Sequence, residues 1–112
     1  MNAHQAIIEV LQFLRQTPEF SELKQAREKL SKNPHANTLV SQFQKKQESL
    51  HSGALSQSQL TYLIDELGKD YEKLNKNPDI KAYFTASEKF SALLNQFIGR
   101  LNSELAKEFA SM

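Results

Sequence analysis

The 112-residue chain has 14 basic and 13 acidic residues, a formal net charge of +1, and no cysteine. Without cysteine it has no disulfides, no thiolate nucleophile and no thiolate-held zinc or iron–sulfur site. The near-neutral charge gives no general electrostatic reason to bind nucleic acid or an anionic membrane. This length predicts one domain, residues 1–112, near the size at which oligomerisation helps to complete a core.

The first predicted helix covers residues 3–16, where Ile7, Val10, Leu11 and Leu14 recur at spacings of three and four. No basic leader precedes this apolar stretch, so we do not expect a signal peptide. No apolar run in the sequence approaches the ~20 residues of a membrane span. We therefore expect a cytoplasmic protein.

Each of the three prolines opens a predicted helix, at Thr17–Pro18, Asn33–Pro34 and Asn77–Pro78. Proline suits the first helical turn because its missing N–H would have no partner there, and the residue before it can act as the cap. The second helix is expected over residues 18–31 and the third over residues 34–51.

Ser52–Gly53 is expected to end the third helix, with Gly53 in a left-handed conformation. Ser56 and Gln59 then have the spacing of a capping box, in which a hydroxyl caps the first turn and a Gln side chain reaches back. The fourth helix is expected to follow as far as about Lys76.

The last predicted helix, residues 78–109, is the longest and contains no internal proline. At ~1.5 Å per residue it would span roughly 48 Å, whereas a compact globule of this size is about 34 Å across. Its apolar face therefore needs a second chain or an elongated hairpin, and we expect the main hairpin to pair it with the fourth helix. No segment alternates with a period of two, so we expect an all-α fold of about five helices, with the long C-terminal helix in a hairpin or bundle with the shorter N-terminal helices.

The candidate core or dimer contacts lie on the broad apolar stripe of this last helix. They are Phe84, Phe90, Leu94, Phe97, Ile98 and Leu101. Such a stripe is too wide for a two-stranded coiled coil and is typical of a helical bundle.

Residues 18–30 are similar in sequence to residues 78–90, at an offset of 60. Two amphipathic helices that begin with the same cap would produce much of this similarity. The alternative is a duplicated helical hairpin with pseudo-twofold packing. The sequence leaves both interpretations open.

No catalytic or metal site is expected, and no cofactor. His4, His35 and His51 lie far apart and form no paired-ligand motif on one helix face. The acidic residues of the fourth helix, among them Asp65, Glu66 and Asp70, alternate with lysines, as on a solvated surface. We therefore expect a protein that is not an enzyme.

The densest basic positions alternate with glutamates, and no aromatic residues lie between them as stacking platforms. They are Lys24, Arg27, Lys29, Lys32, Lys45 and Lys46. Direct RNA binding is kept as the alternative function; in that case neutralising Lys45 and Lys46 should weaken RNA binding and reduce its salt dependence.

Several segments resemble the YlbF/YmcA family of small helical bacterial regulators. They are residues 17–30 (TPEFSELKQAREKL), 33–36 (NPHA), 43–47 (FQKKQ) and 77–83 (NPDIKAY), followed by Phe90, Leu93 and Leu94. The resemblance covers nearly the whole chain in the right order, although these segments are helix starts and apolar positions rather than catalytic motifs.

The resemblance implies a cytoplasmic, dimeric, all-helical regulator from a Gram-positive bacterium, linked to competence, sporulation or biofilm control. Two members of that family assist ribonuclease Y in messenger-RNA processing, which implies protein partners in RNA processing. Those members hold iron–sulfur clusters through cysteines, which this chain lacks. The chain therefore looks more like a cysteine-free branch, of which YheA-type proteins are examples.

Overall fold

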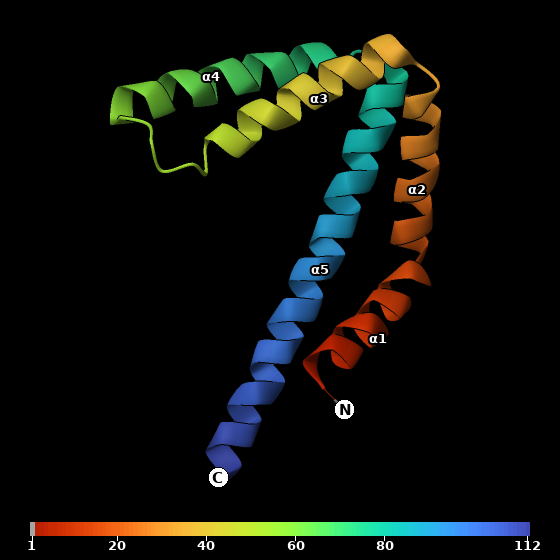
Figure 1. The fold of residues 1–112 in the computed structure, drawn as a ribbon, viewed down its shortest axis with the longest axis vertical. Coiled ribbons are helices and arrows are strands. Elements are labelled where there is room, and N and C mark those ends of the chain that lie inside the picture. Colours follow the sequence, from red (N-terminus) through yellow and green to blue (C-terminus); the bar gives the residue numbers. More distant parts are fainter. Residues whose placement is uncertain (1) are drawn as a thin grey trace. The chain divides into compact units, whose positions relative to one another are not determined.

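The computed structural model describes residues 2–112, which form five α-helices and, within that range, no strand (Figure 1). The helices are α1 (Ala3–Arg15), α2 (Pro18–Ser31), α3 (Pro34–Ser49), α4 (Gln57–Leu74) and α5 (Pro78–Ser111). The predicted all-α class is confirmed. The helix boundaries lie close to the predicted ones because the caps that define them are local features of the sequence.

The predicted caps form at the three proline-initiated helices. Thr17 Oγ1 accepts a hydrogen bond from the backbone N–H of Phe20 at 3.2 Å, and Asn33 Oδ1 accepts one from Ala36 at 3.2 Å. Asn77 Oδ1 accepts two N–H groups of the first turn of α5, at 2.9 and 3.3 Å. Each side chain thus satisfies donors that the first helical turn leaves without an intrahelical partner.

The connection between α3 and α4 also follows the sequence, with one difference. Ser56 and Gln59 form the capping box, with Ser56 Oγ accepting the Gln59 N–H at 3.3 Å and Gln59 Oε1 accepting the Ser56 N–H at 2.8 Å. Gly53 has a φ of 72°, the left-handed region that glycine enters without a Cβ penalty. However, α3 ends at Ser49 and continues in tighter turns, so Gly53 lies beyond the helix rather than at its end.

The chain divides into two compact units. Unit 2 is residues 26–84, and unit 1 combines the described residues up to 25 with residues 85–112. The helices α2 and α5 each contribute to both units.

Most of the buried apolar side chains belong to unit 2. They are Ala26, Leu30, Ala36, Val40, Phe43, Leu67, Ile80, Tyr83 and Phe84. In unit 1 the buried apolar side chains are Leu14 and Ala86. Burial of apolar area is the main stabilising contribution to folding, so the hydrophobic core lies in unit 2.

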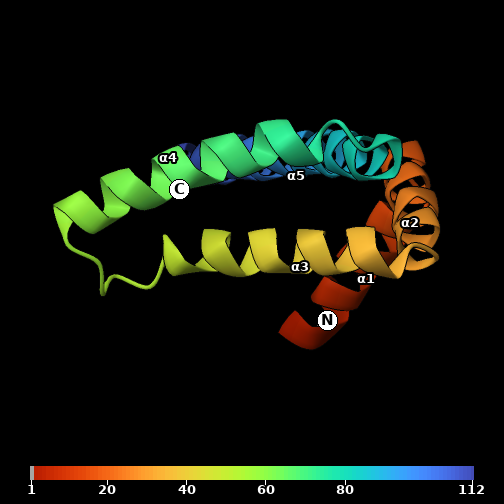
Figure 2. The same cartoon turned by 90° about the horizontal axis from the view of Figure 1, so that it is seen from above.

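Within unit 2, α3 and α4 lie side by side as an antiparallel hairpin closed by residues 50–56 (Figures 1 and 2). The sequence predicts a main hairpin of α4 with α5, whereas the structure pairs α4 with α3. The difference has a physical reason: buried residues of α3, Ala36, Val40 and Phe43, recur at three and four along one face and supply a continuous apolar stripe for α4.

Candidate interaction surfaces

Unit 1 leaves a large number of apolar side chains exposed on α1 and on the second half of α5. On α1 these are Ile7 (59% exposed), Ile8 (40%), Val10 (36%), Leu11 (43%) and Phe13 (54%). On α5 they are Ile98 (51%), Leu101 (49%), Leu105 (44%) and Phe109 (70%). Large apolar side chains exposed in this number typically mark a region that another molecule covers.

Unit 1 is held together by a few contacts. The rings of Phe13 in α1 and Phe97 in α5 lie 6.3 Å apart between centroids, and those of Phe20 and Phe90 lie 5.9 Å apart in an edge arrangement. An exposed ion pair joins Lys89 Nζ to Glu22 Oε2 at 3.4 Å. These contacts position α1 and α2 on α5 but cover only part of their apolar residues.

The six predicted contact residues separate into three groups. Phe84 is 7% exposed and belongs to the core of unit 2. Phe90, Leu94 and Phe97 are half-buried in unit 1. The other two, Ile98 and Leu101, are 51% and 49% exposed in the single chain. The structure therefore places one of the six in the core and leaves Ile98 and Leu101 available to a partner.

The core of unit 2 contains an aromatic cluster. The ring of Phe84 lies 5.5 Å from that of Phe43 and 5.2 Å from that of Tyr71, measured between centroids. Tyr83 packs beside Phe84, and its hydroxyl accepts a hydrogen bond from Gln44 Nε2 at 3.2 Å. This cluster joins α3, α4 and the first turns of α5.

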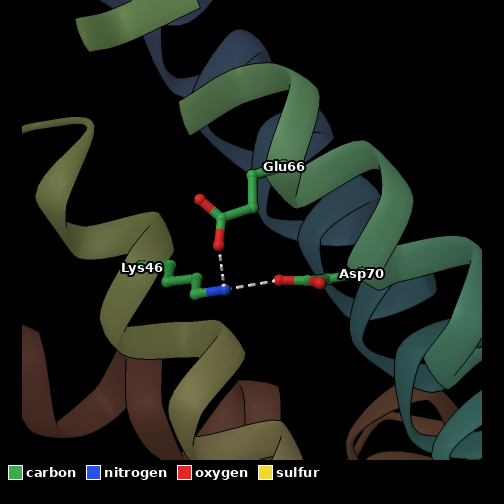
Figure 3. A network of polar contacts seen from close by, with 3 residues as sticks. All are labelled: Lys46, Glu66 and Asp70. Carbon is green, nitrogen blue, oxygen red and sulfur yellow. Dashed lines mark hydrogen bonds and ion pairs between the residues drawn. The ribbon is translucent and has the colours of Figure 1, made fainter. Parts of the chain in front are cut away.

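A cluster of three charges bridges α3 and α4 (Figure 3). Lys46 Nζ in α3 lies 2.8 Å from Glu66 Oε1 and 2.8 Å from Asp70 Oδ2, both in α4. The hydrogen bonds to Asp70 and, next, to Glu66 raise the pKa of the Lys46 ammonium above its ordinary value. Lys46 therefore stays charged over the physiological range and separates two carboxylates that would otherwise repel each other.

The sequence predicts a solvated surface for Glu66 and Asp70 and includes Lys46 among the positions that could contact RNA. Their spacing of four residues was nevertheless informative, because like charges at this spacing are unfavourable without a cation between them. In the structure that cation is Lys46. Asp65, by contrast, makes an exposed contact of 3.2 Å with Lys69 along the same helix, as expected for a solvated helical face.

Two grooves, each of about 440 Å³, follow the seam between α3 and α4 on either side of this charge cluster. The first is lined by Leu39, Gln42, Phe43, Lys46, Asp70, Lys73 and Leu74. The second, near the connecting loop, is lined by Ser49, Leu55, Ser58, Gln59, Tyr62, Leu63 and Glu66. Both are lined by apolar and polar side chains together.

The described residues contain no group of three or more His, Asp or Glu side chains placed to hold a metal ion. None of the five helices, as far as residues 2–112 show, is both long and apolar enough to cross a membrane. The features that remain are surfaces: the exposed apolar face of unit 1 and the α3–α4 seam of unit 2.

Comparison with known proteins gives a match to a family model and to two curated relatives. The family model described as "Control of competence regulator ComK, YlbF/YmcA" matches residues 4–106. A UPF0342 protein from Caldicellulosiruptor bescii is 30% identical over 89 residues, which cover 76% of this chain and 72% of the relative. A UPF0342 protein from Caldicellulosiruptor saccharolyticus is 28% identical over 97 residues, covering 83% and 78%. No solved structure matches.

Proposed function

Because this chain belongs to the YlbF/YmcA family, described as controlling the competence regulator ComK, we propose that it is a regulatory protein that acts through helical protein–protein contacts. In this proposal it is a cytoplasmic homodimer, residues 1–112 form a single family domain, and the protein is not an enzyme. Its absence of cysteine supports assignment to the cysteine-free, YheA-like branch.

The observation that carries the proposal is the exposed apolar surface of unit 1. Nine large apolar side chains on α1 and α5 lie 36% to 70% exposed. A protein that works alone gains nothing from leaving such residues in water, because their burial is favourable by about 25 cal/mol per Å². Binding to other chains is the activity that this surface supports.

The α3–α4 seam supports a second contact, with a protein partner. Leu39, Phe43 and Leu74 line one groove, and Leu55 and Leu63 line the other, while charged groups lie between them. An amphipathic helix could place an apolar side chain in each groove and polar groups over the charge cluster. An adaptor in messenger-RNA processing, competence, sporulation or biofilm control requires such a second surface once the first is used for self-association.

The alternative, direct RNA binding, has less support. Lys46, one of the two adjacent basic residues proposed to contact RNA, is already held by two carboxylates at 2.8 Å. A phosphate would have to compete with both of them for the same ammonium group. Lys45 remains exposed beside it, but one exposed lysine does not make a basic patch.

The test is affinity capture from native cytosol with and without ribonuclease, followed by mass spectrometry. We expect the same protein partners to be recovered in both samples. We also expect Lys73→Glu, on the rim of the first groove, to lose them, whereas Lys76→Glu, an exposed residue outside both grooves, retains them. Partners that disappear on ribonuclease treatment would instead support the RNA-binding alternative.

A further inference from the structure

From Phe90 onward, apolar residues of α5 recur every eleven residues; Phe90 and Leu94 are half-buried, and the later members are exposed. The three pairs at this spacing are Phe90 and Leu101, Leu94 and Leu105, and Ile98 and Phe109. Eleven residues make three turns at 3.67 residues per turn, close to the 3.6 of an ideal helix. The stripe therefore runs nearly straight along the helix, so a partner helix can follow it with little supercoiling.

We propose that the occupant of this stripe is α5 of a second copy, packed antiparallel, with the two α1 helices flanking the pair; this inference rests on the proposed homodimer and adds its face and orientation. The interface is isologous, with the two-fold axis beside Leu101. Leu94 then lies opposite Phe109 of the partner subunit, and Ile98 lies opposite Leu105 of the partner subunit.

The area requirement brings α1 into the interface. The four exposed apolar side chains of α5 are 44% to 70% exposed and present on the order of 400 Å² per chain, against the ~800 Å² per partner of a standard stable interface. The α5 residues alone supply about half of the required area. A stable dimer on this face therefore needs α1 as well as α5, which gives a four-helix arrangement from the two copies.

Charge favours the antiparallel orientation. In the register set by the apolar pairs, Arg100 lies level with Glu104 of the partner subunit, and Glu104 lies level with Arg100 of the partner subunit. Arg100 has no ion-pair partner among residues 2–112, and Glu104 makes only an exposed contact of 3.5 Å with Lys107. A parallel, in-register pair would instead bring each of these charges level with its own copy, which is repulsive.

Single cysteines distinguish the two orientations, because the chain has no other cysteine. A disulfide forms only when the two Cα atoms lie within about 7 Å. In the antiparallel register two copies of Leu101 lie beside the axis, whereas two copies of the exposed Ser91 lie roughly 31 Å apart along it. We expect Leu101→Cys to form a disulfide-linked dimer under mild oxidation and Ser91→Cys to stay unlinked.

Sedimentation of the unoxidised proteins completes the test. Linking of Ser91→Cys as readily as Leu101→Cys would overturn the antiparallel orientation. A dimer in which Leu101→Cys does not link would overturn this face while leaving the proposed homodimer intact, and a monomeric wild type would overturn the homodimer itself.

A charge-swap series provides an independent readout of the same register. Arg100→Glu and Glu104→Arg should each raise the dimer dissociation constant roughly tenfold, and the double variant should restore it. Failure of the double variant to restore affinity would overturn the pairing.

Discussion

The ring of Tyr71 in α4 stacks on the ring of Phe84 in α5, with centroids 5.2 Å apart and planes inclined by 16°. Phe43 in α3 lies against both rings, at 6.3 and 5.5 Å, so one aromatic cluster fixes three helices. Phe84 is 7% exposed and Phe43 is 6% exposed. The stability of unit 2 therefore depends strongly on Phe84.

Phe84→Ala should lower the free energy of unfolding by about 3–5 kcal/mol, because it removes a buried ring and leaves a cavity among its neighbours. Denaturant unfolding followed by circular dichroism measures this change. Tyr62→Ala is the matched control: Tyr62 is 71% exposed, so its truncation should change stability by no more than about 0.5 kcal/mol. Equal effects of the two variants would contradict the proposed core.

The charge cluster predicts a pH-dependent contribution to stability. Lys46→Met should lower the melting temperature, because Glu66 and Asp70 are then left without the cation between them. Lys45→Met, at the neighbouring exposed position, should have a smaller effect.

The sign of the pH dependence follows from the raised pKa of Lys46. The stabilisation is fully present below the ordinary lysine pKa of about 10.4 and is lost as the pH rises through the higher folded value. The difference in melting temperature between wild type and Lys46→Met should therefore be constant from about pH 7 to 9 and shrink above about pH 10.4. If the difference in melting temperature between wild type and Lys46→Met grew at alkaline pH, Lys46 would not be the stabilising cation of this cluster.

The cap of α3 can be tested by removing its acceptor. Asn33→Ala should cost about 1 kcal/mol, because the N–H of Ala36 loses its 3.2 Å hydrogen bond to the Asn33 side chain. Asn37→Ala, an exposed substitution inside the same helix, should be neutral or slightly stabilising, since alanine has the higher helix propensity. Thermal unfolding of the two variants gives the comparison, and a cost at Asn37 equal to that at Asn33 would exclude a specific capping role.

The attachment of α1 depends on few contacts and should be sensitive to Phe97. Of the described residues of α1, only Leu14 is buried, and the Phe13 ring rests against Phe97. Phe97→Ala should speed amide hydrogen exchange throughout α1, because regions with little buried area open with a low free energy. Exchange in α3 should stay unchanged. Uniform acceleration in both helices would mean that the substitution acts on the whole fold instead.

The sequence predicted the features that depend on local chemistry. Asn33 before Pro34 and Ser56 three residues before Gln59 define helix starts without help from the rest of the chain, and both caps form as expected. The length of α5 also followed from local pattern, since no proline interrupts residues 79–111.

Features that join distant segments were harder to predict. Lys46 lies 20 residues from Glu66 in the sequence, and nothing in the local pattern showed that one ammonium group would meet two carboxylates of another helix. The same limitation applied to the hairpin, because the apolar faces of both α3 and α5 are compatible with α4. Period and spacing identify which face is buried but not which helix covers it.

Sedimentation equilibrium of the wild type and of Leu101→Asp tests the central claim, that the protein works through the exposed apolar face of unit 1. We expect the wild type to sediment at twice its chain mass of 12.8 kDa. Leu101→Asp should sediment at the chain mass with its helical circular dichroism retained, because Leu101 is 49% exposed in the single chain. A wild type that remains at the chain mass at all concentrations, or a Leu101→Asp variant that stays dimeric, would contradict the account.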